Sequence, residues 1–475
     1  MTRLPDIETE FPAWYAEVVR AAELAEHSAV RGSMVIRPQG YAIWELLQRA
    51  LDDRIKATGH ENLYFPLLVP RSVMARETDL IEGFAPEVAL VTEAGGSVLE
   101  EPLVVRPTSE ATIWNTYAGW IQSYRDLPLL YNQWANVVRW EMRPRLFLRT
   151  TEFLWQEGHT AHETEGEAIA ECLRILEHVY ADVQESVLAM PVLRGRKSPR
   201  ERFAAARETY TTEAMMRDRK ALQAGTSHYL GDEFARAYGV SYTGRDGQEH
   251  HPFAASWGAS SRLVGGVIMT HGDPSGLRLP PNVAPQQVVI VPIAREGGAP
   301  VLEAADGLAA DLRDRGVRVK LDDRDHVRPG AKFFEWELKG VPLRLELGER
   351  DLAAGSVTVV RRDTGGREQI PLRAAGEHAC RLLEEIQRGL LAEARAFRDG
   401  HTQRFEHRDG MLEFLRAGEG FAVAPWCGSE ECEAEVKAET SATIRCLTLE
   451  QEDPGAPCVV CGRAGAEMAT WAQAY

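Results

Sequence analysis

Apolar positions follow a helical spacing in several stretches of the chain. Between Tyr41 and Leu51 they recur every three or four residues, which predicts an amphipathic helix. A longer apolar stripe between Glu165 and Leu188 predicts a second helix and makes Cys172 a core residue. The run from Leu63 to Pro70 is apolar without a helical period. It predicts a buried strand, which its prolines confine to a sheet edge or a strand end.

The pattern changes near residues 282–286. Residues 288–293 predict a strand, residues 302–312 a helix that Gly316 would end, and residues 317–321 and 343–347 two more strands. Strand-helix-strand repetition predicts a small α/β domain with a partly parallel sheet. A charged helix over 376–398 and a cysteine-bearing module follow. We therefore predict three domains, 1–283, 284–380 and 381–475, which suits a length of 475 residues.

Residues 139–159 combine strand alternation with charged and aromatic side chains. On a hairpin, Arg139 and Glu141 would share a face with Phe153, Trp155, Glu157 and His159, because strand side chains alternate between two faces. A loop with Arg143 and Arg145 would join the strands. Such a face suits a polyanion that carries a flat ring, such as ATP. The alternative is a solvated face with a surface ion pair, although aromatic rings are poor choices for a face open to water.

Composition narrows the class of protein. The net charge of -17 argues against generic nucleic-acid binding, so any RNA would be recognised by shape and specific contacts. No apolar run is long enough to cross a membrane, and the N-terminus lacks a signal-peptide pattern, which predicts a cytosolic protein.

Four cysteines near the C-terminus have the spacing of metal ligands. Cys427 and Cys432 form one knuckle and Cys458 and Cys461 a second, with 25 residues between the two. Four thiolates predict a closed, structural Zn²⁺ site. Disulfides are the alternative, and a cytosolic location disfavours them. The neighbouring Glu430, Glu431 and Glu433 are expected to face water, because they would add charge to a negative site.

Three further motifs have both a structural and a functional interpretation. The Arg-Pro-Thr-Ser-Glu stretch at 106–110 could be a plain helix N-cap. The Gln-Ala-Gly-Thr-Ser-His stretch at 223–228 could be a turn. The small residues at 257–261 open an apolar helix with Arg262 near its start, and a helix N-terminus with an arginine is a good anion site.

Together these motifs resemble those of class II aminoacyl-tRNA synthetases. Residues 139–159 resemble motif 2, the helix and strand around Pro66 resemble motif 1, and residues 257–269 resemble motif 3. The wording Arg-Thr-Thr-Glu-Phe-Leu-Trp-Gln-Glu-Gly-His is similar to prolyl-tRNA synthetases, in the archaeal/eukaryote-like branch with a C-terminal zinc-binding extension. Residues 330–342 resemble the family's anticodon-binding domain. The resemblance covers nearly the whole chain.

The resemblance implies a fold and an activity. The fold is α/β (α+β): a class II antiparallel-sheet catalytic domain, an α/β anticodon-binding domain and a C-terminal α+β zinc-binding domain. The activity is formation of prolyl-adenylate from L-proline and ATP, with Mg²⁺, followed by transfer of proline to tRNA(Pro) by a homodimer. Only 93 residues separate His162 from Ser256, too few for the editing domain that bacterial-type relatives insert there.

The resemblance also implies roles for individual residues. Catalysis would rest on Arg139 and Arg262. Proline would be bound by Thr108, Glu110, Arg139, Trp155, Glu157, His159 and His228. ATP would be bound by Arg139, Glu141, Arg149, Thr150, Phe153, Gln223, Thr226 and Arg262. The tRNA would be contacted by Arg143, Arg145, Lys332, Lys339, Arg344 and Glu346. The C-terminal Tyr475 would tuck toward the active site.

Two alternatives to a prolyl-tRNA synthetase remain at this point. One is another class IIa synthetase, for threonine, serine, glycine or histidine, which the Thr-Ser-Glu loop and the Trp155/His159 pair disfavour. The other is an inactive relative that serves as a binding module, for which the loss of Arg139, Arg262 or the Thr-x-Glu loop would be the expected mark. All of these residues are present.

Overall fold

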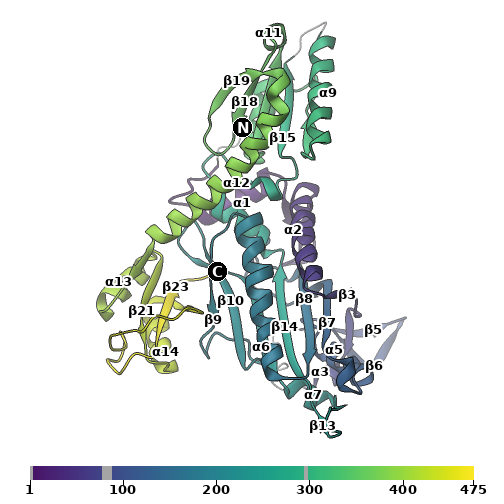
Figure 1. Cartoon of the computed structure of the whole chain (residues 1–475), viewed down its shortest axis with the longest axis vertical. Helices are drawn as coiled ribbons and strands as arrows, with labels where there is room; N and C mark the ends of the chain where they lie inside the picture. Colours follow the sequence, from purple (N-terminus) through teal and green to yellow (C-terminus); the bar gives the residue numbers. More distant parts are fainter. Residues whose placement is uncertain (1–3, 77–87, 294–297) are drawn as a thin grey trace.

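The computed structural model describes residues 4–76, 88–293 and 298–475. Figure 1 shows three parts: an α/β domain at the top, a large central sheet with its helices, and a smaller C-terminal unit beside that sheet. The long helix α12 (Ala375–Gly400) runs from the first part to the last. The boundary that we predict after residue 380 therefore falls inside a continuous helix.

The central part contains most of the elements before residue 284. Its helices are α1 (Phe11–Ala21), α2 (Pro38–Ala57), α3 (Arg71–Met74), α5 (Glu110–Trp120), η1 (Tyr124–Asp126), α6 (Glu165–Arg174), η2 (Ile175–Ala181), η3 (Val183–Val187), α7 (Glu233–Tyr238), α8 (Arg262–His271) and η4 (Pro281–Val283). Its strands are β1 (Ala25–His27), β2 (Met34–Ile36), β3 (Glu61–Leu63), β4 (Leu68–Pro70), β5 (Ala89–Ala94), β6 (Ser97–Val105), β7 (Leu129–Val138), β8 (Glu152–His162), β9 (Val192–Arg196), β10 (Glu208–Met215), β11 (Ala221–Gly231), β12 (Tyr242–Thr243), β13 (Glu249–His250) and β14 (Phe253–Ser260).

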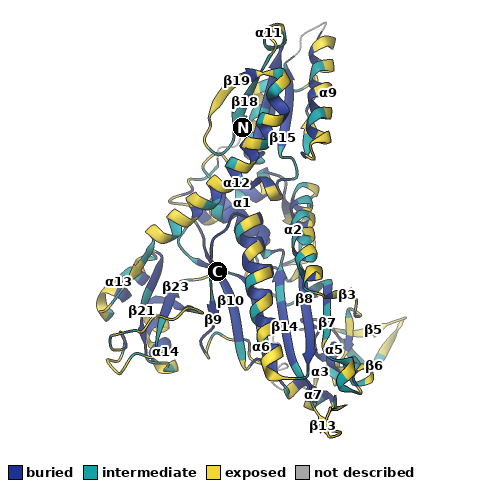
Figure 2. Cartoon of the chain, viewed as in Figure 1, coloured by how far each residue is buried: buried dark blue, intermediate teal, exposed yellow. Residues whose placement is uncertain are grey.

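One sheet of 11 strands runs through the central part and the C-terminal unit. Its order is β20-β21-β23-β22-β9-β10-β11-β14-β8-β7-β3, and the pairs from β9 to β7 are antiparallel. Helices α2, α6 and α8 pack on the sheet, and its strands are largely buried, as Figure 2 shows in dark blue. The sheet is thus a rigid base for side chains that project from β8, β11 and β14.

The α/β domain holds a second, five-stranded sheet in the order β16-β15-β17-β18-β19. Strand β15 is parallel to both of its neighbours, and the remaining pairs are antiparallel. The elements of this domain are β15 (Val288–Ile293), α9 (Ala299–Asp314), β16 (Val319–Leu321), α10 (Pro329–Leu338), β17 (Leu343–Gly348), α11 (Glu349–Ala353), β18 (Ser356–Arg361), β19 (Arg367–Pro371) and η5 (Leu372–Ala374). This confirms the partly parallel sheet predicted from the sequence.

The C-terminal unit begins where α12 ends. It consists of β20 (Thr402–Arg404), α13 (Arg408–Ala417), β21 (Phe421–Trp426), α14 (Glu430–Thr440), β22 (Thr443–Thr448) and β23 (Glu467–Ala472). Strand β22 pairs with β9 of the central part, with Leu447 opposite Arg196. The unit therefore extends the central sheet rather than folding as a detached module.

The helix predictions are confirmed. Helix α2 includes the stretch predicted at 41–51, and the helix predicted at 165–188 continues from α6 through the π-helical segments η2 and η3. Cys172 is fully buried, as expected for a core residue. Among the described residues, no helix is both long and apolar enough to span a membrane.

Two strand predictions are wrong in their bounds. The run from 63 to 70 splits into β3 and β4, and Tyr64 between them is 67% exposed. The first strand of the 139–159 hairpin, β7, already ends at Val138, so Arg139 and Glu141 belong to the loop. The loop contains Pro144 and reverses at Phe147, whose φ of 63° lies in the left-handed region. A proline and a residue in the left-handed region both interrupt a strand, so this part of the predicted hairpin is a loop.

Candidate functional site

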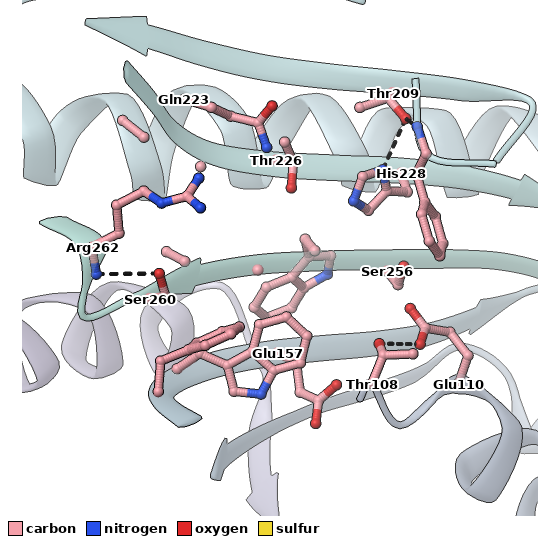
Figure 3. Close-up of a pocket in the computed structure, with 18 of the residues that line it drawn as sticks. Thr108, Glu110, Glu157, Thr209, Gln223, Thr226, His228, Ser256, Ser260 and Arg262 are labelled. Carbon is pink, nitrogen blue, oxygen red and sulfur yellow. Dashed lines mark hydrogen bonds between the residues drawn. The ribbon is translucent and has the colours of Figure 1, made fainter. Parts of the chain in front are cut away.

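A cavity of about 270 Å³ opens on the central sheet where β11, β14 and β8 lie side by side. Figure 3 shows its side chains converging from these strands and from the loop before α5. The predicted residues that line it are Thr108, Glu110, Arg139, Phe153, Trp155, Glu157, His159, Gln223, Thr226, His228 and Arg262. The structure therefore brings together residues that lie more than 150 positions apart in the sequence.

One end of the cavity is acidic. Glu110 is the first residue of α5 and only 4% exposed, and the Thr108 hydroxyl donates a hydrogen bond to its Oε2. Ser109 holds the N-cap position, but its side chain does not cap the helix; its hydroxyl donates to Glu157 instead. The predicted N-cap position is thus confirmed, but the capping hydrogen bond is not formed. The loop points a hydroxyl and a carboxylate into the cavity (Figure 3).

A buried ion pair supports this end. Glu157 Oε2 lies 3.0 Å from His159 Nε2, and both side chains are almost fully buried. Burial would raise the pKa of Glu157, but His159 and the donors Ser109 and Gln133 outweigh it and lower that pKa. Burial likewise opposes the charge on His159, while Glu157 and Glu110 raise its pKa. Both shifts favour the charged pair, which fixes the floor of the cavity.

Arg139 lies between the two ends of the cavity. Its Nε donates to the carbonyl of Pro107 at 2.9 Å, which fixes the stem of the guanidinium. The guanidinium carbon lies 5.6 Å from the centre of the Phe153 ring and 5.3 Å from that of Trp155. These cation–π contacts help to fix the guanidinium within the cavity.

The other end is cationic. Arg262 begins α8, and its Nε donates to the carbonyl of Leu148 at 3.0 Å. Burial, Arg139 and Arg149 together lower its pKa to about 10, which still leaves it charged. A smaller cavity adjoins the first and shares Arg139, Phe153 and Arg262 with it. The predicted Glu141, Arg149 and Thr150 line this second cavity, and Arg149 lies 3.2 Å from Glu141.

The wall formed by β11 carries the remaining predicted side chains. Gln223 and Thr226 lie toward Arg262, and His228 lies at the acidic end (Figure 3). His228 Nδ1 is 2.9 Å from the Thr209 hydroxyl. Burial, with Arg139 and His159 nearby, lowers the pKa of His228 to about 3, so its ring is neutral.

The loop between β7 and β8 carries Arg143 and Arg145, both exposed beside the cavities. The guanidinium of Arg145 lies 5.9 Å from the centre of the Tyr475 ring. The Tyr475 hydroxyl donates to Asp218 at 2.6 Å, and its backbone N–H donates to the carbonyl of Ala221. The C-terminal residue is thus fixed beside this loop, although it does not line the main cavity.

The candidate RNA contacts of the α/β domain are mostly engaged within the protein. Lys332 is 3% exposed and its Nζ donates to the carbonyl of Asp322. Lys339 pairs with Glu23 and Glu335. Glu346 is 2% exposed and pairs with Arg344 and Arg367. In this conformation Lys332 and Glu346 are not on the surface, contrary to what an RNA contact requires. Arg344 and Arg367 instead line a surface pocket with Arg361 and Arg362.

The four predicted metal ligands meet at one point. The sulfur atoms of Cys427, Cys432, Cys458 and Cys461 all lie within 4.8 Å of one another, and Cys427 is 3.7 Å from Cys432 and 3.6 Å from Cys461. All seven cysteines are free thiols. Bonds of about 2.3 Å to a tetrahedral zinc ion would place the sulfurs about 3.8 Å apart. The donor set therefore fits Zn²⁺.

Glu433 corrects one expectation about this region. Glu430 and Glu431 are exposed, as expected, but Glu433 is fully buried, and its Oε1 accepts from the backbone N–H of Ile444 at 3.2 Å. Burial raises its pKa. The reason is its position on α14, where it turns inward together with Cys432.

Sequence reasoning missed several residues of the site. Ser109 and Gln133 bond to Glu157, and Phe203, Thr209 and Trp257 line the cavity. For Trp257 the sequence did contain a signal, the glycine at position 158, because glycine inside a strand often marks a close approach. A Cβ on Gly158 would lie 2.1 Å from the Trp257 ring. Phe203 lies in an irregular segment with no periodic pattern, so the sequence offered no signal for it.

The chain matches three protein families along its length. Residues 96–271 match the tRNA synthetase class II core domain (G, H, P, S and T), residues 287–378 the anticodon binding domain, and residues 409–475 the prolyl-tRNA synthetase C-terminal domain.

Curated relatives match over nearly their whole length. A proline–tRNA ligase of Rhodococcus jostii is 54% identical over 96% of this chain and 95% of its own. One of Clostridioides difficile is 50% identical over 99% of this chain and 97% of its own. The crystal structure of a prolyl-tRNA synthetase from Cryptosporidium parvum, complexed with halofuginone and AMPPNP, is 39% identical and superposes with a TM-score of 0.95 over 100% of this chain and 99% of its own.

Proposed function

Because the chain belongs to the prolyl-tRNA synthetase family of class II aminoacyl-tRNA synthetases, we propose that it joins L-proline to ATP as prolyl-adenylate and then passes proline to tRNA(Pro). The observation that supports this best is the position of Arg139. It lies between an acidic end, suited to an ammonium, and a cationic end, suited to phosphates.

The acidic end would bind the imino group of proline. A secondary ammonium has two N–H donors and one charge, and Glu110 with Thr108 offers a carboxylate and a hydroxyl side by side. Trp155, the Glu157–His159 pair and the neutral His228 would enclose the apolar ring. The two charges of this buried pair face each other, so the pair shapes the pocket without presenting an unpaired charge to the ring.

The cationic end would bind ATP. Arg139 would bridge the proline carboxylate and the α-phosphate, Phe153 would stack on adenine and Glu141 would accept from its amino group. Arg149 and Arg262 would hold the outer phosphates, with Thr150, Gln223 and Thr226 supplying polar contacts. Attack of a carboxylate on phosphorus needs in-line positioning and charge neutralisation rather than a protein nucleophile. When bound, Mg²⁺ would add to that neutralisation.

The tRNA would contact two separate surfaces. The exposed Arg143 and Arg145 would touch the acceptor end next to the cavity. The anticodon would meet the α/β domain at the pocket with Arg344, where Arg367 adds charge. Lys339 and the buried Lys332 and Glu346 would then position this surface.

Three further features complete the proposal. We propose that Cys427, Cys432, Cys458 and Cys461 hold a structural Zn²⁺ and that the chain belongs to the branch with a C-terminal zinc-binding extension; the distances between the four sulfur atoms support the zinc site. The chain has no editing domain, which is supported by residues 163–255 forming helices and strands of the central part. The enzyme acts as a homodimer, for which the resemblance to motif 1 is the support. Its proposed location is the cytosol.

Proline-dependent exchange between ATP and pyrophosphate tests the assignment. We expect Arg139→Ala to reduce the exchange rate by about 100-fold or more, because it removes charge stabilisation from the reacting centre. Arg236→Ala is the matched control, since Arg236 is exposed and pairs with Asp232 on the surface. Near-normal exchange in Arg139→Ala would overturn the assignment.

A further inference from the structure

An irregular segment forms one wall of the amino-acid end of the cavity. Residues 197–207 connect β9 to β10 without regular structure, and Glu201, Arg202 and Phe203 line the cavity. The Phe203 ring lies 5.0 Å from the His228 ring, centre to centre, and its backbone N–H donates to the Thr209 hydroxyl at 3.1 Å. Backbone hydrogen bonds from Lys197 to Thr209 and from Arg207 to Tyr229 hold the two ends of the segment. The residues between them pair with no strand, so their position depends on local turns and side-chain contacts.

The C-terminal unit supplies such a contact. Arg445 of β22 is 7% exposed, and its Nη1 donates to Glu201 Oε2 at 3.1 Å. Its Nε donates to Glu213 Oε2 at 3.2 Å, and Lys197 Nζ donates to Glu213 Oε1 at 2.5 Å. Both members of the Lys197–Glu213 pair are almost completely buried. One guanidinium thus joins a residue of the cavity wall to a carboxylate of β10.

The four charges balance one another only when Arg445 is present. Burial would raise the pKa of Glu213, but Arg445 and Lys197 outweigh it and lower that pKa. Without Arg445, Glu213 retains the charge of Lys197 and the hydroxyl of Thr211. Glu201 retains Lys437, whose side chain is 51% exposed and whose Nζ lies 3.5 Å away. A planar guanidinium can bond to two carboxylates at fixed angles, which an ammonium does less well.

The neighbouring backbone makes this link rigid. Strand β22 pairs with β9, and a Cβ on Gly195 would lie 2.1 Å from the carbonyl oxygen of Leu447, so the two strands approach closely. The backbone N–H of Ala221, at the start of β11, donates to the carbonyl of Gln473. The C-terminal unit therefore contacts both the 197–207 segment and the strand that carries His228.

We propose that Arg445 is a positioning residue for proline binding: by bonding to Glu201 and Glu213 it fixes the 197–207 segment against the acidic end of the cavity. The inference rests on the proposed function. It assigns the C-terminal unit a part in amino-acid affinity, exerted through Arg445 and not through contact with the substrate. Glu213 lies opposite Gln223 on β11, and the charges of Glu213 and Arg445 act on Arg262 with opposite signs. ATP binding is therefore expected to change less than proline binding, because the 197–207 segment itself lies at the acidic end.

Exchange kinetics test the proposal with Arg445→Met, Arg445→Lys, Glu201→Gln and the double variant Arg445→Met/Glu201→Gln. We expect Arg445→Met to raise the KM for proline roughly tenfold, within the range for residues of one network, and to change the KM for ATP less than about twofold. Arg445→Lys should recover part of the loss. In the Glu201→Gln background, Arg445→Met should raise the KM for proline by a smaller factor than in the wild type, because the bond to the cavity wall is already weakened and only the bond to Glu213 remains to be lost.

Arg416→Ala is the matched control, since Arg416 pairs with Glu439 within the C-terminal unit and touches no cavity residue. Equal increases in the KM for proline and for ATP, or full additivity in the double variant, would overturn the proposal in favour of a merely structural role. If Arg445→Met does not fold, Glu201→Gln with Arg445→Lys still tests the link. A wild-type enzyme without proline-dependent exchange would instead refute the proposed function.

Discussion

Replacing Glu110 with glutamine should weaken proline binding selectively. The change keeps the size of the side chain and its hydrogen bond with Thr108 but removes the one carboxylate that the acidic end presents beside that hydroxyl. Because Glu110 is 4% exposed, water does not screen the interaction. A hydrogen bond to a charged group is worth about 1.5–3 kcal/mol. The KM for proline should therefore rise roughly 10- to 150-fold, while the KM for ATP stays within about twofold.

The same substitution at Glu349 provides a matched control. Glu110 is the first residue of α5, so its loss also removes a favourable charge from a helix N-terminus, which is worth about 0.3–1 kcal/mol of stability. Glu349 is the exposed first residue of α11, far from the cavity, and Glu349→Gln reproduces that effect alone. Proline-dependent exchange measured on both variants separates the two contributions. A change of less than about twofold in the KM for proline in folded Glu110→Gln would refute the reasoning.

Three more outcomes follow from the structure. Cys432→Ser should lower the zinc content below one ion per chain, measured by metal analysis, and lower the unfolding temperature; unchanged zinc would contradict the site. Gly158→Ala should destabilise the fold by about 1–3 kcal/mol, because its Cβ would overlap the Trp257 ring. Gly166→Ala is the control, since open space surrounds Gly166. Equal melting temperatures of the two variants would refute the prediction. The stabilising effect of His159, compared with His159→Gln, should be full below about pH 6.5 and decline as pH rises through its raised pKa; an advantage that grows with pH would contradict the ion pair.

The sequence predicted the parts of the fold that depend on periodic patterns. The stripes of α2 and α6 and the strands β15 and β17 were readable because their apolar faces are continuous. The four metal-ligand candidates were readable because thiolate spacing is specific. Long-range packing was not: nothing in residues 443–448 indicates that β22 extends the central sheet.

The same distinction applies to the site. Phe153, Trp155, Glu157 and His159 alternate along β8, so their shared cavity could be predicted. The position of Phe203 could not, because an irregular segment is held by tertiary contacts. The resemblance to the anticodon-binding domain named Lys332 as a tRNA contact but could not indicate its burial. Its Nζ is drawn inward to the carbonyl of Asp322.

Aminoacylation of tRNA(Pro) with proline, alanine and cysteine tests the central claim most directly. The account predicts efficient charging with proline. It predicts weaker but measurable charging with alanine and cysteine, because an apolar pocket rejects a smaller side chain by only a modest factor. Absence of charging with proline, or preference for another amino acid, would contradict it.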